Sequence, residues 1–169
     1  MNRKFVSLIP WLLVAFLMTG CHRDPRPAGM PKLYPASITV TQEGTPLGGA
    51  MVQLIPEDSA NSRWGPSGLS DASGIVVLRT NGRYPGAPLG TYKVVVSKQE
   101  FEPHPHPEWA NLPEDDPNHW KYVQIVENLK AYEVVDRKCG SIADTPLRIE
   151  VTAKEKTYSV DVGKKPGAR

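Results

Sequence analysis

The stretch Gly90–Ser97, with the sequence GTYKVVVS, decides the fold class of this chain. Within it, Tyr92, Val94 and Val96 occupy every second position. Successive side chains of a β-strand point to opposite faces, so this alternation predicts a strand with one buried row. We expect that row to face inward, in a closed core made by two β layers.

The same period of two recurs on both sides of this stretch. Turn residues separate the strands, as at Asp71–Gly74, where the glycine can adopt a positive φ. Near the C-terminus two alternating stretches flank Ala153–Glu155, which predicts a hairpin with one solvated face. A count of about seven strands predicts an all-β, two-sheet sandwich of the immunoglobulin-like type. The clearest of the other predicted strands are Ser37–Thr41, Ala50–Leu54, Ile75–Thr80, Leu147–Thr152 and Tyr158–Val162.

Residues 99–145 do not follow the strand pattern and predict a long insertion before the C-terminal hairpin. Asp116 followed by Pro117 is typical of a helix N-terminus. Apolar residues at every third position then predict a modest amphipathic helix that ends near Lys130. An irregular covering loop is the alternative for the same residues. The predicted apolar stripe consists of Trp120, Val123, Val126 and Leu129.

Residues 1–20 have the features of a bacterial export signal, with two basic residues before an apolar stretch. That stretch is shorter than the roughly 20 residues of a membrane-spanning helix. The sequence LMTGC at Leu17–Cys21 resembles the lipobox of bacterial lipoproteins. The resemblance implies cleavage directly before Cys21 and a diacylglycerol on its thiol, which would anchor the chain to a membrane. The alternative is an ordinary secretory signal followed by a chance cysteine.

The chain therefore divides into four predicted parts. Residues 1–20 are a lipoprotein signal peptide, 21–35 a proline-rich tether, 36–163 the β-sandwich and 164–169 a short tail. The lipoprotein resemblance places the protein in the bacterial cell envelope. Because position 22 is not the aspartate that retains many lipoproteins at the inner membrane, we expect the outer membrane.

Charge disfavours one class of partner. The chain has 20 Lys and Arg against 18 Asp and Glu, and two of the basic residues lie in the predicted signal peptide. The remaining 18 basic residues balance the 18 acidic ones, so the mature chain lacks the basic excess of nucleic-acid-binding proteins. With lipid on Cys21, Cys139 has no cysteine partner, and we expect it to be a small buried residue.

Four segments occur in an order that resembles the transthyretin-like, carboxypeptidase-regulatory-like domain family. The first three are Thr45–Val52, Leu69–Gly74 and Pro88–Val96. The fourth, Asp144–Val151, is similar to the closing strand of bacterial lipoproteins that carry this domain. The resemblance implies a seven-stranded prealbumin-like sandwich. It implies no activity, because this domain is in most settings an accessory or adhesion-like module.

The segment Glu102–Glu108, EPHPHPE, is the main candidate for metal chemistry. Two imidazoles two residues apart, His104 and His106, are a candidate pair of ligands for one metal ion, and His119, Asp115 or Asp116 would complete the site. Such a site would make the protein a metal-dependent enzyme, similar to intradiol dioxygenases or hydroxyisourate hydrolase on related sandwiches. The prolines around the histidine pair depart from the first family, and the C-terminus lacks the Tyr-Arg-Gly-Ser motif of the second. The alternative is an exposed polyproline-like loop, and we expect no catalytic residue and no cofactor.

Residues outside the predicted strands are candidates for binding. Trp64, Trp109 and Trp120 lie in loops or in the insertion, where aromatic rings form platforms for sugars or protein partners. Arg83 lies in a glycine turn. The alternative is that the tryptophans cap the open ends of the sandwich. We expect a lipid-anchored, non-catalytic envelope protein that binds a protein or a glycan through its insertion, or that serves as an envelope structural element.

Overall fold

The computed structural model of this chain describes residues 26–167, so the predicted signal peptide and Cys21 lie outside the described residues. The chain divides into two compact units, Met1–Met30 and Pro31–Arg169, and the strands and helices of the described residues belong to the second. Between residues 26 and 167, no helix has the length and apolar character needed to cross a membrane.

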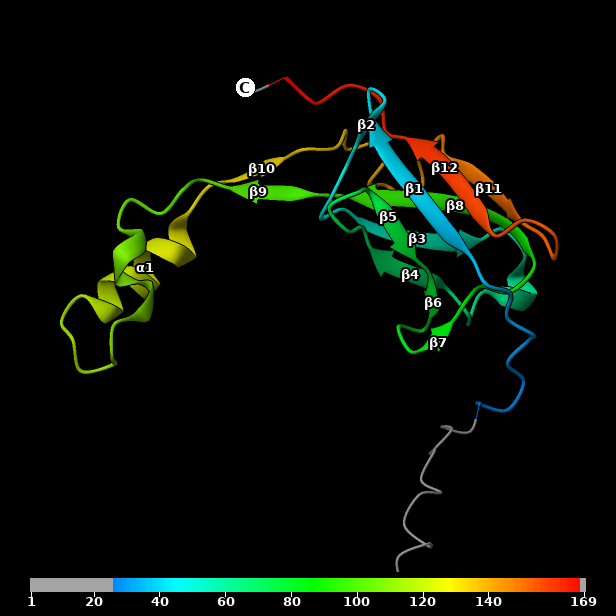
Figure 1. The fold of residues 1–169 in the computed structure, drawn as a ribbon, viewed down its shortest axis with the longest axis horizontal. Coiled ribbons are helices and arrows are strands. Elements are labelled where there is room, and N and C mark those ends of the chain that lie inside the picture. The colour runs from blue at the N-terminus through cyan, green and yellow to red at the C-terminus, as the bar shows by residue number, and fades with distance from the viewer. Residues whose placement is uncertain (1–25, 168–169) are drawn as a thin grey trace, which may run out of the picture. The chain divides into compact units, whose positions relative to one another are not determined.

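Pro31–Arg169 is mostly β, with two main sheets and a separate two-stranded ribbon (Figure 1). Within each main sheet neighbouring strands pair in the antiparallel sense, except for β1 and β12, which are parallel. Sheet I has the order β12–β1–β2, with β5 also paired to β1, and sheet II has the order β11–β8–β3–β4–β6–β7. The bounds in sheet I are β1 Ser37–Gln42, β2 Thr45–Pro46, β5 Ile75–Val77 and β12 Thr157–Asp161. Those in sheet II are β3 Met51–Pro56, β4 Pro66–Leu69, β6 Arg79–Thr80, β7 Tyr84–Pro85, β8 Gly90–Ser97 and β11 Arg148–Val151.

The two sheets share one hydrophobic core because alternate residues of their strands point inward. In β8, Tyr92, Val94 and Val96 are fully buried, as the alternation predicts, and Ile38 of β1 enters the same cluster from sheet I. The Tyr92 hydroxyl donates a hydrogen bond to the Pro88 carbonyl at 2.8 Å, and burial raises the pKa of Tyr92 to about 12. The prediction of an all-β sandwich is confirmed at the level of fold class.

The predicted turn at Asp71–Gly74 is also present. Gly74 has a φ of +75°, and its N–H donates to the Asp71 carbonyl at 2.9 Å. The Asp71 carboxylate accepts from the backbone N–H groups of Ser73 and Ile75, which closes the turn. A Cβ at position 74 would lie 2.5 Å from the Val40 carbonyl oxygen, so the site requires glycine for space as well as for backbone conformation.

The predicted C-terminal hairpin is wrong. β11 pairs with β8 in sheet II, and β12 pairs in parallel with β1 in sheet I. The link between them is closed by side chains, because the Tyr158 hydroxyl donates to the Glu155 carbonyl and accepts from the Thr152 N–H. Alternation identifies the buried face of each strand, and that face points into the same core from either sheet. The pattern therefore does not determine which strand is the neighbour.

The insertion in the structure is shorter than the predicted range 99–145. Its first part contains the ribbon of β9 (Gln99–Phe101) and β10 (Ala131–Glu133), with the 3-10 helix η2 (Pro107–Asn111) and the helix α1 (His119–Asn128) between them (Figure 1). Residues 134–145 instead pack onto the sandwich. Val134, Val135 and Cys139 are buried there, and the Thr145 hydroxyl donates to the Val94 carbonyl at 2.6 Å. A second short 3-10 helix, η1 (Ser59–Asn61), follows β3.

Candidate functional site

Residues 99–133, which we call the 99–133 segment, contain a groove that is the main candidate site. The β9–β10 ribbon holds the two ends of the segment together. Pro103, Pro105 and Pro107 then favour an extended backbone that leads into η2, because each proline ring restricts φ. The chain returns along α1, which contacts η2. The groove lies between the proline-rich stretch and α1.

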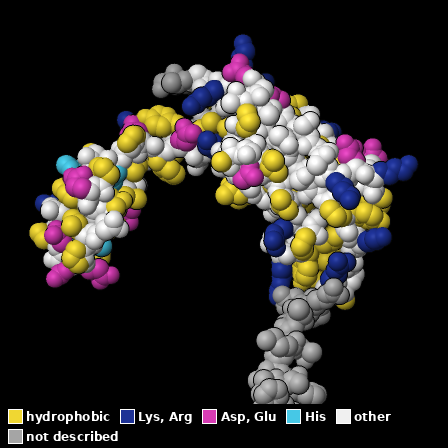
Figure 2. Space-filling view, viewed as in Figure 1, with side chains coloured by type: hydrophobic (Ala, Val, Ile, Leu, Met, Phe, Trp, Pro, Cys, Tyr) yellow, Lys and Arg dark blue, Asp and Glu magenta, His cyan; other side chains and the backbone are white. Residues whose placement is uncertain are grey.

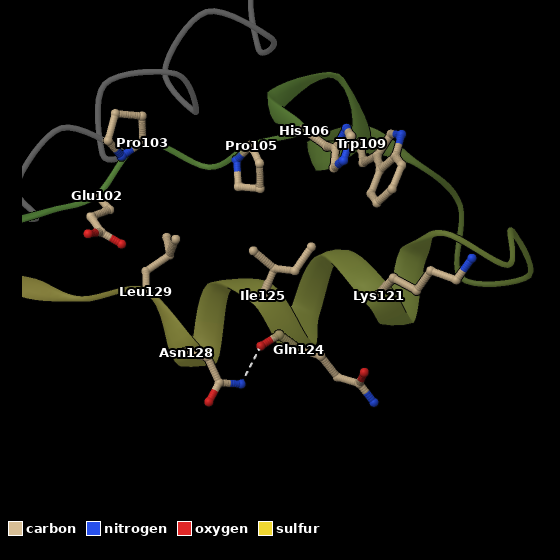
Figure 3. Close-up of a pocket in the computed structure, with 10 residues that line it drawn as sticks. All are labelled: Glu102, Pro103, Pro105, His106, Trp109, Lys121, Gln124, Ile125, Asn128 and Leu129. Atoms are coloured by element: carbon tan, nitrogen blue, oxygen red, sulfur yellow. Dashed lines mark hydrogen bonds between the residues drawn. The ribbon is translucent and has the colours of Figure 1, made fainter.

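Apolar side chains face one another across this groove, which has a volume of about 770 Å³. Figure 3 shows Ile125 and Leu129 on the side of α1 turned toward the proline-rich stretch, while Gln124 and Asn128 extend from the other side. The Asn128 amide donates to the Gln124 carbonyl at 2.7 Å, one turn earlier in the helix. No residue of α1 is fully buried, so the helix keeps exposed surface on both of its sides.

An aromatic and charged rim surrounds the groove. The His106 ring stacks on Trp109 with 4.0 Å between the ring centroids and an angle of 11° between the planes. His106 Nδ1 lies 3.1 Å from the Glu108 carboxylate. The pKa of Glu108 is lowered, chiefly because a backbone N–H of Glu108 donates to its carboxylate, with a smaller contribution from His106. Glu102 and Lys121 add one charge of each sign to the lining.

The three candidate metal ligands make separate contacts. His104 Nδ1 accepts the backbone N–H of His106 at 2.9 Å, and its ring lies 4.3 Å from that of Tyr122. Within the part of the chain that the structure describes, the buried Nε2 of His104 has no hydrogen-bond partner. His119 Nδ1 lies 3.0 Å from the Leu112 carbonyl oxygen. Among residues 26–167, no group of three or more His, Cys, Asp or Glu side chains is arranged to hold a metal ion.

The four candidate binding residues lie in different places. Trp109 lines the groove, whereas Trp120 is on the same segment outside it, with 63% of its surface exposed. Trp64 is 6% exposed, which leaves little of its ring for a partner, as expected if this tryptophan caps the sandwich. Arg83 lies between β6 and β7, with its guanidinium 5.9 Å from the centroid of the Tyr84 ring.

The predicted stripe contains only part of the apolar floor of the groove, because it includes Leu129 but not Ile125. It also includes Trp120 and Val126, which are both exposed. The stripe that faces the proline-rich stretch contains Tyr122, Ile125 and Leu129. Both stripes repeat at helical spacing, so periodicity alone does not separate them. The three alternating prolines were the available signal for the opposite wall.

The helix also begins later than predicted. α1 starts at His119 with Asn118 as its N-cap residue, whereas the Asp116 carboxylate accepts the Asn118 N–H at 2.8 Å in the preceding turn. Cys139 is buried as predicted, and its thiol pKa is raised by burial and then by Asp136. A raised pKa keeps this thiol protonated and unsuited to act as a nucleophile.

The 99–133 segment has a strong charge imbalance. It contains two basic residues, Lys121 and Lys130, against eight acidic ones, and therefore has a formal net charge of −6. A groove with an apolar floor on a segment of negative net charge is suited to hold a cationic, partly apolar ligand. The acidic residues are Glu100, Glu102, Glu108, Glu114, Asp115, Asp116, Glu127 and Glu133.

Comparison of the chain with models of protein families, with curated proteins and with solved structures finds no match.

Proposed function

We propose that this protein is a lipid-anchored component of a bacterial cell envelope, with Cys21 as the anchor. Its transthyretin-like sandwich carries the 99–133 segment, which binds an envelope partner without catalysis. The anchor is supported by the lipobox-like Leu17–Cys21 and by the basic and apolar residues before it. The proline-rich tether that follows gives the sandwich reach above the membrane surface.

The seven-stranded, prealbumin-like identity of the sandwich is part of this proposal. Its support is the agreement between the family-like motifs and the places where strands begin or turn. Thr45–Pro46 forms β2, Asp71–Gly74 closes the turn before β5, and Gly90 begins the central strand β8. Each motif thus has the structural role that its residue types favour.

The observation that carries the binding role is the groove between the proline-rich stretch and α1. Ile125 and Leu129 provide an apolar floor, and Trp109 provides part of an aromatic rim. The 99–133 segment as a whole has a formal net charge of −6, which favours a protein ligand that presents lysine or arginine beside an apolar side chain. Among the expected partners, an envelope protein therefore fits better than a neutral glycan.

Site-specific photocrosslinking in the native envelope tests this role. A photoreactive residue in place of Lys121, on the groove lining, should give a discrete adduct with one partner protein. The matched control replaces Thr91, an exposed residue of β8 that does not line the groove, and should give no such adduct. Ile125→Lys with Leu129→Lys should abolish the adduct, because two cations would enter the apolar floor. Equal adducts from both positions would contradict a specific groove.

A further inference from the structure

A group of exposed cations lies at one end of the sandwich. This basic patch consists of Lys32, Arg63, Arg79 and Arg83, and all four residues are exposed. Figure 2 shows Lys and Arg side chains gathered around hydrophobic ones at the end of the sandwich that carries β6 and β7. The mature chain is formally neutral, so this local excess is not a consequence of overall composition.

Backbone contacts bring the four cations together from distant parts of the chain. Tyr34, two residues after Lys32, pairs with Ala87 through backbone hydrogen bonds of 2.8 and 2.9 Å. The Asn81 N–H donates to the carbonyl of Gly65, which links the β6–β7 turn to the segment that carries Arg63. The patch is therefore a consequence of the fold rather than a run of charges in the sequence.

Three of these cations lie close to aromatic rings. Lys32 Nζ is 5.0 Å from the centroid of the Tyr34 ring. The guanidinium carbons of Arg63 and Arg83 are 5.6 and 5.9 Å from the ring centroids of the tryptophan and tyrosine that follow them in sequence. Leu89 adds an exposed apolar side chain, 41% accessible, at the same end. Basic, aromatic and apolar groups side by side are typical of surfaces that meet lipid headgroups.

Two acidic residues among the described residues at this end make contacts outside the patch. Glu57 pairs with Arg148 at 2.9 Å, and the Asp58 carboxylate accepts the Ala60 N–H as the cap of η1. The link between β11 and β12 reaches the same end, where the Lys156 carbonyl accepts the N–H of the first residue of β1. That link adds two lysines and one glutamate, Lys154, Lys156 and Glu155.

The patch is also close to the proposed anchor along the chain. Ten residues separate Cys21 from Lys32, so even a fully extended tether spans at most about 40 Å. We propose that the basic patch binds the anionic headgroups of the membrane in which the lipid on Cys21 is inserted. The choice of this membrane as the binding surface rests on the proposed lipid anchor. Contact with headgroups would hold the sandwich with this end toward the bilayer.

Vesicle binding by the chain from His22 onward tests the patch without the anchor, because this chain keeps every described residue. Vesicles of phosphatidylcholine with about 30% phosphatidylglycerol should bind it, and pure phosphatidylcholine vesicles should not. About 0.5 M NaCl should release it, because the Debye length then falls to a few ångströms. Equal binding to both vesicle types, or binding to neither, would overturn the proposal.

Charge-removing variants locate the contact. Each basic side chain at an anionic surface strengthens binding about fivefold, so Arg63→Ala with Arg83→Ala should weaken it roughly 25-fold. The matched control, Lys164→Ala with Lys165→Ala, removes two exposed cations that follow the opposite end of β12 and should change little. Lys32→Ala alone precedes the first strand and should weaken binding about fivefold without disturbing the sheets. Loss in the control but not in the patch variants would refute the assignment.

This experiment separates the patch from the anchor. Absence of vesicle binding by the chain from His22 would leave lipid attachment at Cys21 intact, whereas absence of lipid on Cys21 would leave vesicle binding intact. Thermal unfolding of each variant identifies any loss of affinity that follows from a damaged fold.

Discussion

At the scale of single residues, Asp161 shows how one exposed carboxylate joins three parts of the sandwich. It accepts hydrogen bonds from the Thr41 hydroxyl at 2.7 Å and from the N–H groups of Gly44 and Gly163 at 2.9 and 2.7 Å. These donors lie at the end of β1, in the turn before β2 and after β12. The pKa of Asp161 falls from 3.8 to about 2, chiefly because of the Thr41 hydroxyl and then because of the Gly44 and Gly163 N–H groups.

The lowered pKa of Asp161 predicts a specific dependence of stability on pH. A carboxylate with a depressed folded-state pKa stabilises the fold above its unfolded pKa and loses this contribution as pH falls through the folded value. Asp161→Asn should lower the free energy of unfolding by about 1 kcal/mol at pH 7, a small value because the site is exposed. The difference from the unaltered protein should shrink between pH 4 and pH 2.

Urea unfolding across this pH range measures the difference. The control is Glu155→Gln, which neutralises an exposed carboxylate in the link between β11 and β12 and should have little effect. A difference for Asp161→Asn that stays constant from pH 7 to pH 2 would show that the charge of Asp161 does not stabilise the fold.

At the scale of elements, the sequence predicts strands and turns better than it predicts their neighbours. The alternation around Tyr92 identifies both a strand and its buried face, because the period of two follows from local backbone geometry. The pairing of β11 and β12 depends on which sheet edges are open, and this information is distributed over the whole chain. The side of α1 that faces the groove is equally hard to predict. One apolar stripe contains Trp120 and another contains Ile125, and both repeat at helical spacing. The groove depends on the packing of the proline-rich stretch beside α1, which local periodicity does not determine.

The 99–133 segment should be separable from the sandwich. In the β9–β10 ribbon Phe101 lies opposite Ala131, and the Glu102 N–H donates to the Lys130 carbonyl at 3.0 Å. Glu102 and Lys130 can therefore flank a tight turn. Replacing residues 103–129 with Asn-Gly gives the two-residue connection that hairpins favour. We expect the thermal midpoint to change little, because no residue of η2 or α1 is buried.

Thermal unfolding by circular dichroism checks this expectation. Co-purification of the partner that crosslinks at position 121 checks the loss of groove binding, because the replacement removes Lys121 itself. A matched variant keeps the segment and changes only the apolar floor, with Ile125→Ser and Leu129→Ser. Collapse of the sandwich after the replacement would show that the segment contributes to the core.

At the scale of the whole molecule, the proposals assign different roles to separate parts of one chain. The 99–133 segment has a formal charge of −6, and residues 21–98 and 134–169 together have the compensating +6, part of which forms the basic patch. A headgroup-binding end and an acidic partner-binding segment would give the protein opposite electrostatic preferences at two sites. Low salt should favour both contacts, whereas the lipid anchor should not depend on salt.

Substitution of the two cysteines tests the anchor directly. Each buried methylene of a lipid chain adds about 0.8 kcal/mol, so acyl chains on Cys21 should keep the protein on membranes washed with about 1 M NaCl. Cys21→Ser should abolish incorporation of labelled palmitate and leave the chain at its precursor mass. Cys139→Ser is the matched control, because that thiol is buried in the sandwich and should not accept lipid. Palmitate retained in Cys21→Ser, or a mature chain released from membranes by salt alone, would contradict the anchor while leaving the basic patch to be judged by vesicle binding.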